Sequence, residues 1–89
     1  MSATYNVITV SSTATLIVPS NPGRNFLFIQ NVGATTVYFG MDANVTTSTY
    51  AFTLFPQAQM QISGGDQYGS AWYGVTGSTG SVSYGDVGP

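Results

Sequence analysis

Few residues in this sequence can carry out acid–base, nucleophilic or metal chemistry. The charged ones are a single basic residue, Arg24, and three carboxylates, Asp42, Asp66 and Asp86. Paired carboxylates support glycoside hydrolysis, and carboxylates combined with carbonyl oxygens hold Ca²⁺. Here each aspartate stands alone, beside glycine or in an expected turn, and none has the spacing of a known calcium loop. We expect these aspartates to form turns with their own backbone, with calcium binding as the alternative.

The other common catalytic groupings cannot be assembled from these residue types. A serine nucleophile needs a histidine or lysine base, and the sequence contains neither. Cysteine is absent, and zinc or transition-metal sites are built from histidine and cysteine. We therefore expect no catalytic residue, no metal site, no cofactor and no enzymatic activity.

The low charge excludes several classes of partner. Charged residues make up 4% of the chain, whereas about 25% is usual. With one cation and a formal net charge of -2, the chain lacks the basic patch that nucleic-acid binding or a membrane-surface helix requires. The N-terminal residues contain no long apolar segment, so we expect no membrane span. Because 43% of the residues are hydrophobic and 13% aromatic, the chain should nevertheless fold.

The length predicts one domain, residues 1–89, with a thin core. A chain of 89 residues buries roughly 60 to 65% of the surface that its unfolded form exposes. Domains of this size commonly rely on disulfides, a metal or association, and the absence of cysteine and histidine leaves association. The last residues, 85–89, thin into glycine, aspartate and proline, and we expect them to form a flexible tail.

The elements that position these residues are expected to be strands. Val, Ile, Thr, Tyr and Phe alternate with polar residues in short runs that end at Gly, Pro, Asn or Ser. The predicted strands are residues 5–10, 14–18, 25–30, 36–40, 51–55, 57–63, 70–76 and 80–84. Seven or eight short antiparallel strands at this spacing predict an all-β fold, a small single-domain β-sandwich of jelly-roll or immunoglobulin-like type.

Three segments give more detailed expectations. Residues 25–30 are apolar on both faces, which is typical of a central strand, and residues 25–30 and 36–40 suggest a hairpin-like pair. Residues 57–63 alternate apolar Ala58, Met60 and Ile62 with polar side chains, as a half-buried strand does. Residues 41–50 form the longest irregular stretch, either a functional loop or a plain surface connection.

The candidate contact residues are Arg24, Tyr50, Trp72 and Tyr84. The chain has more aromatic side chains than one small core holds, so some should reach the surface as interface anchors or, alternatively, as sugar platforms. Arg24 is expected to pair with a carboxylate or with strand-end carbonyl groups, and a contact with a partner is the alternative.

The stretch GRNFLFIQNVGATTVYFG, residues 23–40, carries a resemblance to a known group of proteins. An arginine, an apolar strand, Asn-x-Gly and a strand ending in Tyr-x-Gly are followed by LFP and by the aromatic strand AWYGVTG. This order, over roughly residues 14–84, resembles that of small bacteriophage virion proteins. These are β-sandwich proteins that decorate or cement the head or form parts of fibres.

The resemblance implies a structural protein on the outer capsid surface of the virion. It would bind the major capsid protein, associate with itself as a homotrimer, and stabilise the assembled head as a decoration or cement protein. The alternative is a head- or tail-fibre module that contacts a host surface glycan through residues 41–50 and exposed aromatic side chains. A sugar-binding or sugar-cleaving domain of a larger enzyme is a third hypothesis.

Overall fold

The computed structural model describes residues 3–62 and 71–87, and these form eight strands in two antiparallel sheets. Sheet A has the order β1-β8-β3-β6 and sheet B the order β2-β7-β4-β5. The strands of sheet A are β1 (Ala3–Val10), β8 (Gly80–Val87), β3 (Phe26–Asn31) and β6 (Gln59–Ile62). The strands of sheet B are β2 (Thr15–Val18), β7 (Trp72–Thr76), β4 (Val37–Gly40) and β5 (Phe52–Leu54). The expected all-β sandwich is confirmed.

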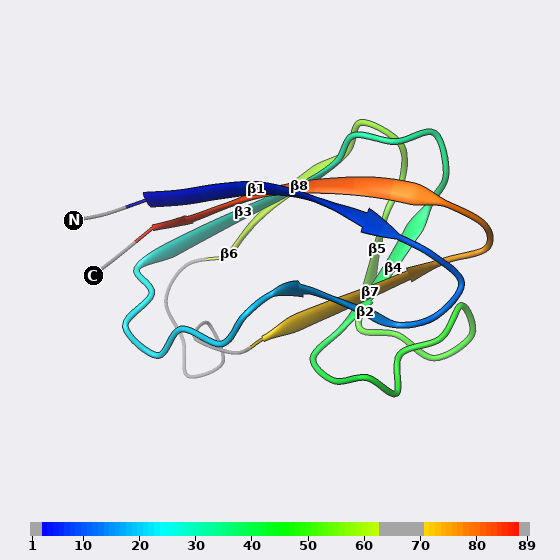
Figure 1. Cartoon of the computed structure of the whole chain (residues 1–89), viewed down its shortest axis with the longest axis horizontal. Coiled ribbons are helices and arrows are strands. Elements are labelled where there is room, and N and C mark those ends of the chain that lie inside the picture. The colour runs from blue at the N-terminus through cyan, green and yellow to red at the C-terminus, as the bar shows by residue number, and fades with distance from the viewer. Residues whose placement is uncertain (1–2, 63–70, 88–89) are drawn as a thin grey trace.

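The pairing of the strands identifies the winding of the chain. β1 pairs with β8, β2 with β7, β3 with β6, and β4 with β5. The chain therefore runs as one long antiparallel ribbon that folds back at β4 and β5. The pairs β3·β8 and β4·β7 roll this ribbon into two layers. This is a jelly roll, and Figure 1 shows the β1, β8 and β3 layer above β2 and β7.

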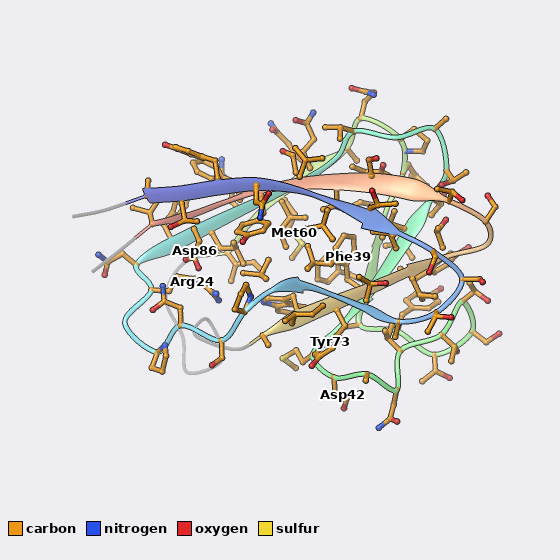
Figure 2. All side chains as sticks on the ribbon, in the orientation of Figure 1. Arg24, Phe39, Asp42, Met60, Tyr73 and Asp86 are labelled. Carbon is orange, nitrogen blue, oxygen red and sulfur yellow. The ribbon has the colours of Figure 1, made fainter. Side chains whose placement is uncertain are left out.

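The core lies between the two layers and is built by the period of two along each strand. Leu27 and Ile29 of β3 and Val82 of β8 are fully buried, and they face Val37 and Phe39 of sheet B. Met60 and Ile62 of β6 pack against this cluster, while Gln59 and Gln61 are exposed, as the alternation predicted. Phe39 lies near the centre of the interior in Figure 2.

The expected hairpin between residues 25–30 and 36–40 is wrong. β3 belongs to sheet A and β4 to sheet B, so the connection between them crosses from one layer to the other. The buried side chain of Asn31 holds this crossing. Its Nδ2 donates to the carbonyl oxygens of Thr35 at 2.7 Å and Leu54 at 2.9 Å, and its Oδ1 accepts from the amide of Gly33 at 3.0 Å. These three hydrogen bonds tie the Asn31 side chain to the connection after β3 and to β5 of the other sheet.

Most of the predicted strands differ from the observed ones by one to three residues at an end, and the differences at β8 and β6 are the most informative. Residues 85–87, predicted as part of a flexible tail, belong to β8, where the Asn25 amide donates to the Val87 carbonyl oxygen at 2.8 Å. β6 begins at Gln59 and not at Gln57, because Gln57 has a φ of 70° and the chain turns there. The predicted strand ends at Ser63 and Ser70, and residues 88–89 of the tail, lie outside the described residues. In the described ranges, no helix is long and apolar enough to cross a membrane.

Candidate functional site

Arg24 lies inside the domain and forms a salt bridge. Its Nε donates to Asp86 Oδ1 at 2.8 Å and its Nη2 to Asp86 Oδ2 at 3.2 Å, a bidentate pair, and Nη2 also donates to the Pro19 carbonyl oxygen at 2.8 Å. The Arg24 side chain is fully buried and that of Asp86 is 10% exposed. Figure 2 places the pair at the end of the sandwich where β1 begins and β8 ends. The expected carboxylate pairing is confirmed, and burial leaves Arg24 no exposed surface for a partner.

Trp72 and Tyr84, the two other buried candidates, belong to the core. Trp72 is 5% exposed and packs edge-on against Phe52 at a centroid distance of 5.3 Å; Tyr84 is 7% exposed. Their expected roles as surface anchors are wrong, because β7 and β8 direct these two side chains into the core. Trp72 Nε1 is buried without a hydrogen-bond acceptor among the described residues. Tyr50, at 48% exposure, is the candidate that reaches the surface.

The aspartates differ from one another. Asp42 forms the expected turn, since its Oδ1 accepts from the amide of Asn44 at 2.9 Å. The turn expected at Asp86 is wrong, because Asp86 lies within β8 and binds Arg24. Asp66 lies outside the described residues. Within the described part of the chain, no group of three or more His, Cys, Asp or Glu side chains gathers to hold a metal ion.

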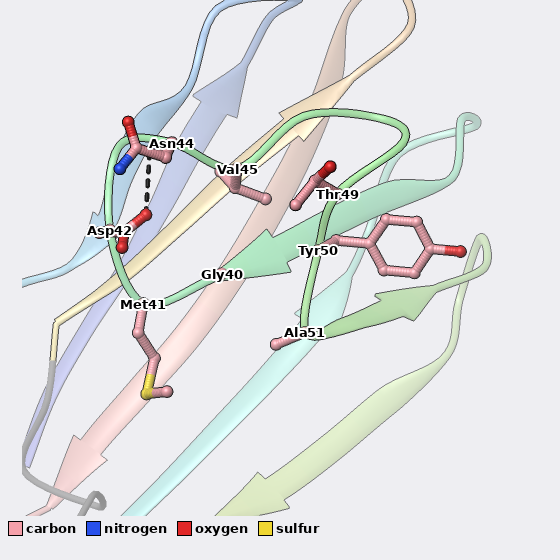
Figure 3. Close-up of a pocket in the computed structure, with 8 residues that line it drawn as sticks. All are labelled: Gly40, Met41, Asp42, Asn44, Val45, Thr49, Tyr50 and Ala51. Carbon is pink, nitrogen blue, oxygen red and sulfur yellow. Dashed lines mark hydrogen bonds between the residues drawn. The ribbon is translucent and has the colours of Figure 1, made fainter.

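The outer face of sheet B is covered in part by the chain's own loop, residues 41–51, while Leu16 of β2 on the same face stays 43% exposed. Val45 is 6% exposed and packs over Gly40, where an added Cβ would lie 2.9 Å from the Val45 Cβ. The Tyr50 ring lies 5.1 Å from the ring of Tyr38 on the same outer face. The Thr49 carbonyl accepts from the Thr46 amide at 2.8 Å, which closes the loop. Figure 3 shows this loop folded over β4; we call this side of the molecule the covered face.

The loop borders a pocket of about 340 Å³ that is open to solvent. Gly40, Val45 and Ala51 line its floor and walls together with Met41, Asp42, Asn44, Thr49 and Tyr50. In Figure 3 the Tyr50 ring points away from Asp42 and Asn44, which lie on the other arm of the loop. The pocket thus has the polar groups of Asp42 and Asn44 on one arm, while the Tyr50 ring extends from the other arm away from them (Figure 3).

The outer face of sheet A has no such cover, and we call it the bare face. Residues that are paired directly across an antiparallel sheet point to the same side, so the strand register defines this face. Its side chains are Ala3, Tyr5, Val7 and Thr9 of β1, Ser81, Ser83, Gly85 and Val87 of β8, Phe26, Phe28 and Gln30 of β3, and Gln59 and Gln61 of β6. Tyr5 is 74% exposed, Val7 61% and Phe28 38%. None of these side chains carries a charge.

A hollow lies on the bare face beside Ser83 and Gly85 of β8. The register places Gly85 between Tyr5 and Phe28, and Ser83 between Val7 and Gln30. Small side chains on β8 are therefore flanked by larger ones on β1 and β3, and the hollow has a volume of about 230 Å³. An added Cβ at Gly85 would lie 2.8 Å from Phe28 Cδ2 and 3.2 Å from Tyr5 Cδ1, so both rings lean over this glycine.

The sequence reasoning did not single out the bare face. Its signal is present in residues 81–85, where small Ser81, Ser83 and Gly85 alternate with large Val82 and Tyr84. That alternation places Tyr84 inside with Val82 and leaves the small residues outside. The exposed aromatic side chains on this face, Tyr5 and Phe28, belong to strands whose periodicity does not say which side faces solvent.

Comparison with known proteins shows a likeness in fold alone. No family model matches the chain, and no curated protein matches it. A solved structure from work on Bacillus endospore appendages, described as a novel family of disulfide-linked pili, is similar with a TM-score of 0.50. The match covers 96% of this chain and 82% of that one at 10% identity. The 89 residues here contain no cysteine, so they offer no thiol for such a linkage.

Proposed function

We propose that this chain is a structural protein of a bacteriophage virion, a decoration or cement protein that attaches to the outer surface of the assembled capsid. The observation that carries the proposal is the bare face, a whole sheet surface with exposed Tyr5, Val7 and Phe28 and no charge. Such a surface is suited to a broad contact with another protein, since charges are depleted at the centres of interfaces. The resemblance of residues 23–40 to virion proteins favours the capsid as the assembly.

The proposed action requires association and no chemistry. A protein that binds the assembled lattice and not its separated subunits stabilises the lattice by mass action, by about 2.7 kcal/mol per site at a free concentration of about 100 times Kd. The proposal includes contact with the major capsid protein and self-association, for which the resemblance implies a trimer. The few charges of the described residues do not oppose this, since Arg24 and Asp86 pair internally.

The test is to remove the protein from its particle and return it. Particles without the protein should lose infectivity or release DNA at a lower temperature than intact particles, and purified protein should restore the loss. A quantitative gel should give a copy number comparable to that of the major capsid protein. Particles that survive heating and osmotic shock equally well without the protein would contradict the proposal.

The pocket of the covered face favours one alternative function, a fibre module that binds a neutral host glycan. Tyr50 lines the pocket together with polar Asp42, Asn44 and Thr49, its exposed ring lies beside the pocket (Figure 3), and sugars bind to surfaces that combine an aromatic ring with polar groups. This function predicts few copies per virion. It also predicts glycan binding that Tyr50→Ala abolishes and Tyr50→Phe retains, since the phenylalanine keeps the ring. A glycan array that shows no binding would remove this alternative.

A further inference from the structure

We propose that the outer edge of β1 accepts an extended segment of the capsid protein as a fifth strand of sheet A. This inference rests on the proposed function, which supplies the partner, and it adds the way in which that partner is held. β1 lies at one margin of sheet A and pairs with β8 along all of its eight residues. We call its other side, where no described strand pairs with it, the free edge.

The strand register shows which backbone groups point to the free edge. In an antiparallel pair, alternate residues exchange hydrogen bonds with the opposite strand, and the residues between them turn their amide and carbonyl groups the other way. The Val32 amide donates to the Ser81 carbonyl oxygen at 3.0 Å, so odd-numbered residues of β8 face β3 and even-numbered ones face β1. The even-numbered residues of β1 therefore bond to β8. The free edge carries the amide and carbonyl groups of Ala3, Tyr5, Val7 and Thr9.

The hydrogen bonds of β1 agree with this direction. The Val7 amide donates to Oδ1 of its neighbour Asn6 at 2.9 Å, and both residues are exposed. Among the described residues, no other hydrogen bond reaches the free edge. The carbonyl oxygen of an added strand can take the place of the Asn6 side chain. A row of main-chain donors and acceptors matches another extended main chain, whereas a helix has bonded these groups internally and a glycan has none.

The free edge of β1 lacks the features that usually keep edge strands from pairing. Such strands are commonly short, bulged, charged or interrupted by proline. Residues 3–10, ATYNVITV, contain no charge and no proline, and their register with β8 is unbroken. The other edge strands differ, since β2 and β6 have four residues each, β5 has three, and β2 shifts register between Leu16 and Val18. Among the described strands, β1 alone is a long and regular edge.

The lengths of these strands also argue against another copy of this chain as the added strand. Pairing β1 with β1 of a second copy is a twofold contact, which closes a dimer and not the trimer that the resemblance implies. Pairing β1 with β2, β5 or β6 of another copy would leave half or more of its eight residues unpaired. A different polypeptide is therefore the better occupant, and in the proposed function that polypeptide is the capsid protein.

The surroundings of the free edge define the kind of segment that fits. The side chains of residues 3–7 are exposed on both faces of β1, which leaves room beside them for another strand. Tyr5 and Val7 lie on the bare face, and aromatic or β-branched side chains opposite them pack well. Because β1 carries no charge, we expect an uncharged segment. The same residues border the bare face, so one segment would continue the contact proposed for that face.

Hydrogen exchange of the unaltered full chain tests the inference. In the free protein the amides of Tyr5 and Thr9 should exchange rapidly, while those of Asn6 and Ile8, which face β8, should be protected. Attachment to particles stripped of the protein should slow exchange at Tyr5, Val7 and Thr9 by at least about tenfold. The protein is labelled on the particle and released under quenching conditions, and NMR then gives the deuterium content residue by residue.

A proline on the free edge gives a second readout. Val7→Pro removes one donor from this edge and leaves the hydrogen bonds to β8 in place, because proline is tolerated where the strand nitrogen faces solvent. The folded variant should attach to stripped particles with a dissociation constant raised by about tenfold, since the facing carbonyl group loses its donor and meets the ring. The matched control is Val7→Thr, which keeps the amide and the branched side chain and should attach as the wild type does. Thermal unfolding shows whether each variant folds.

Three outcomes would overturn the inference. Attachment that leaves exchange at Tyr5 and Thr9 unchanged, or equal attachment of Val7→Pro and Val7→Thr, means that the capsid protein binds elsewhere, and the proposed function stands. Protection of these amides that rises with protein concentration in the absence of particles means that another copy occupies the edge. Wild-type protein that does not attach to stripped particles contradicts the proposed function and the inference together. If Val7→Pro does not fold, the exchange measurement on the wild type decides alone.

Discussion

The two outer faces of this sandwich both carry uncharged residues, yet a loop of the chain covers part of one face and no described segment covers the other. On the covered face the loop of residues 41–51 seats Val45 over Gly40 and lays Tyr50 beside Tyr38. On the bare face Tyr5, Val7 and Phe28 remain exposed, and no described segment lies over them. The comparison teaches that composition does not distinguish a sheet face that a loop covers in part from one that stays bare. The difference lies in whether a loop of the chain folds back over the sheet.

Gly40 and Gly85 show the same difference between the covered face and the bare face. Gly40 leaves room for the branched Cβ of a buried valine, which stands close to the backbone and cannot move aside. Gly85 leaves room for ring carbons of Phe28 and Tyr5, which lie at the far ends of exposed side chains. One glycine thus makes room for a buried valine, and the other makes room for two exposed rings on the bare face.

The largest effect is expected from breaking the salt bridge that anchors β8, the central strand under the bare face. Arg24→Ala leaves the Asp86 carboxylate unpaired in a site where it is 10% exposed, and should lower the free energy of unfolding by about 3–5 kcal/mol. Small domains have about 5–15 kcal/mol in total, so much of the protein should unfold in moderate urea. Equilibrium urea denaturation measures the change.

The double variant Arg24→Met with Asp86→Leu is the control for this prediction. It replaces both charges by apolar side chains, so no buried charge is left alone, and it should recover most of the lost stability. A loss below about 1 kcal/mol in Arg24→Ala would mean that the pair contributes no more than a surface salt bridge does.

The next largest effect tests the covered face. Gly40→Ala places a Cβ 2.9 Å from the Val45 Cβ, so the loop must shift, and we expect a cost of about 1–3 kcal/mol. Gly77→Ala is the matched control, because no atom lies within 4 Å of the added Cβ there. Thermal unfolding of the three proteins gives the comparison. Equal melting temperatures for Gly40→Ala and the wild type would show that the loop does not bind the sheet as described.

The same substitution on the bare face should cost less. Gly85→Ala meets ring carbons at 2.8 and 3.2 Å, but these exposed rings can rotate toward solvent, and alanine is favoured over glycine within a strand. We expect a change below about 1 kcal/mol in the free energy of unfolding, in either direction. If Gly85→Ala is as destabilising as Gly40→Ala, the rings are fixed in place and the contrast between the two faces is wrong.

Sequence patterns predicted the all-β sandwich and most strand positions, because alternation in segments such as residues 57–63 reflects burial on one side of a strand. They also predicted a carboxylate partner for Arg24, since a lone arginine in so uncharged a chain needs an acceptor. Sequence patterns did not predict which strands belong to the same sheet. The hairpin expected for residues 25–40 is absent because Asn31 supports a crossing, and nothing in a period of two separates these outcomes.

The residues that face solvent were also hard to predict, because the sequence does not say which side of a strand is turned outward. Aromatic type alone does not say which side of a strand faces solvent, and Trp72 and Tyr84 proved to be core residues. The bare face became recognisable only with the strand register, which aligned Tyr5, Gly85 and Phe28 across three strands that are distant in sequence.

The variant with the smallest expected change in stability gives the most direct test of whether the bare face is a contact surface. Gln59→Glu is nearly isosteric and exposed, so the free energy of unfolding should change by no more than about 0.5 kcal/mol. Co-sedimentation of the folded variant with particles stripped of the protein should nevertheless show attachment lost or strongly weakened. The matched control Thr47→Glu, which adds the same charge to the exposed loop of the covered face, should attach as the wild type does. Equal attachment of the two variants would contradict the claim that the bare face is the surface through which this protein joins its assembly.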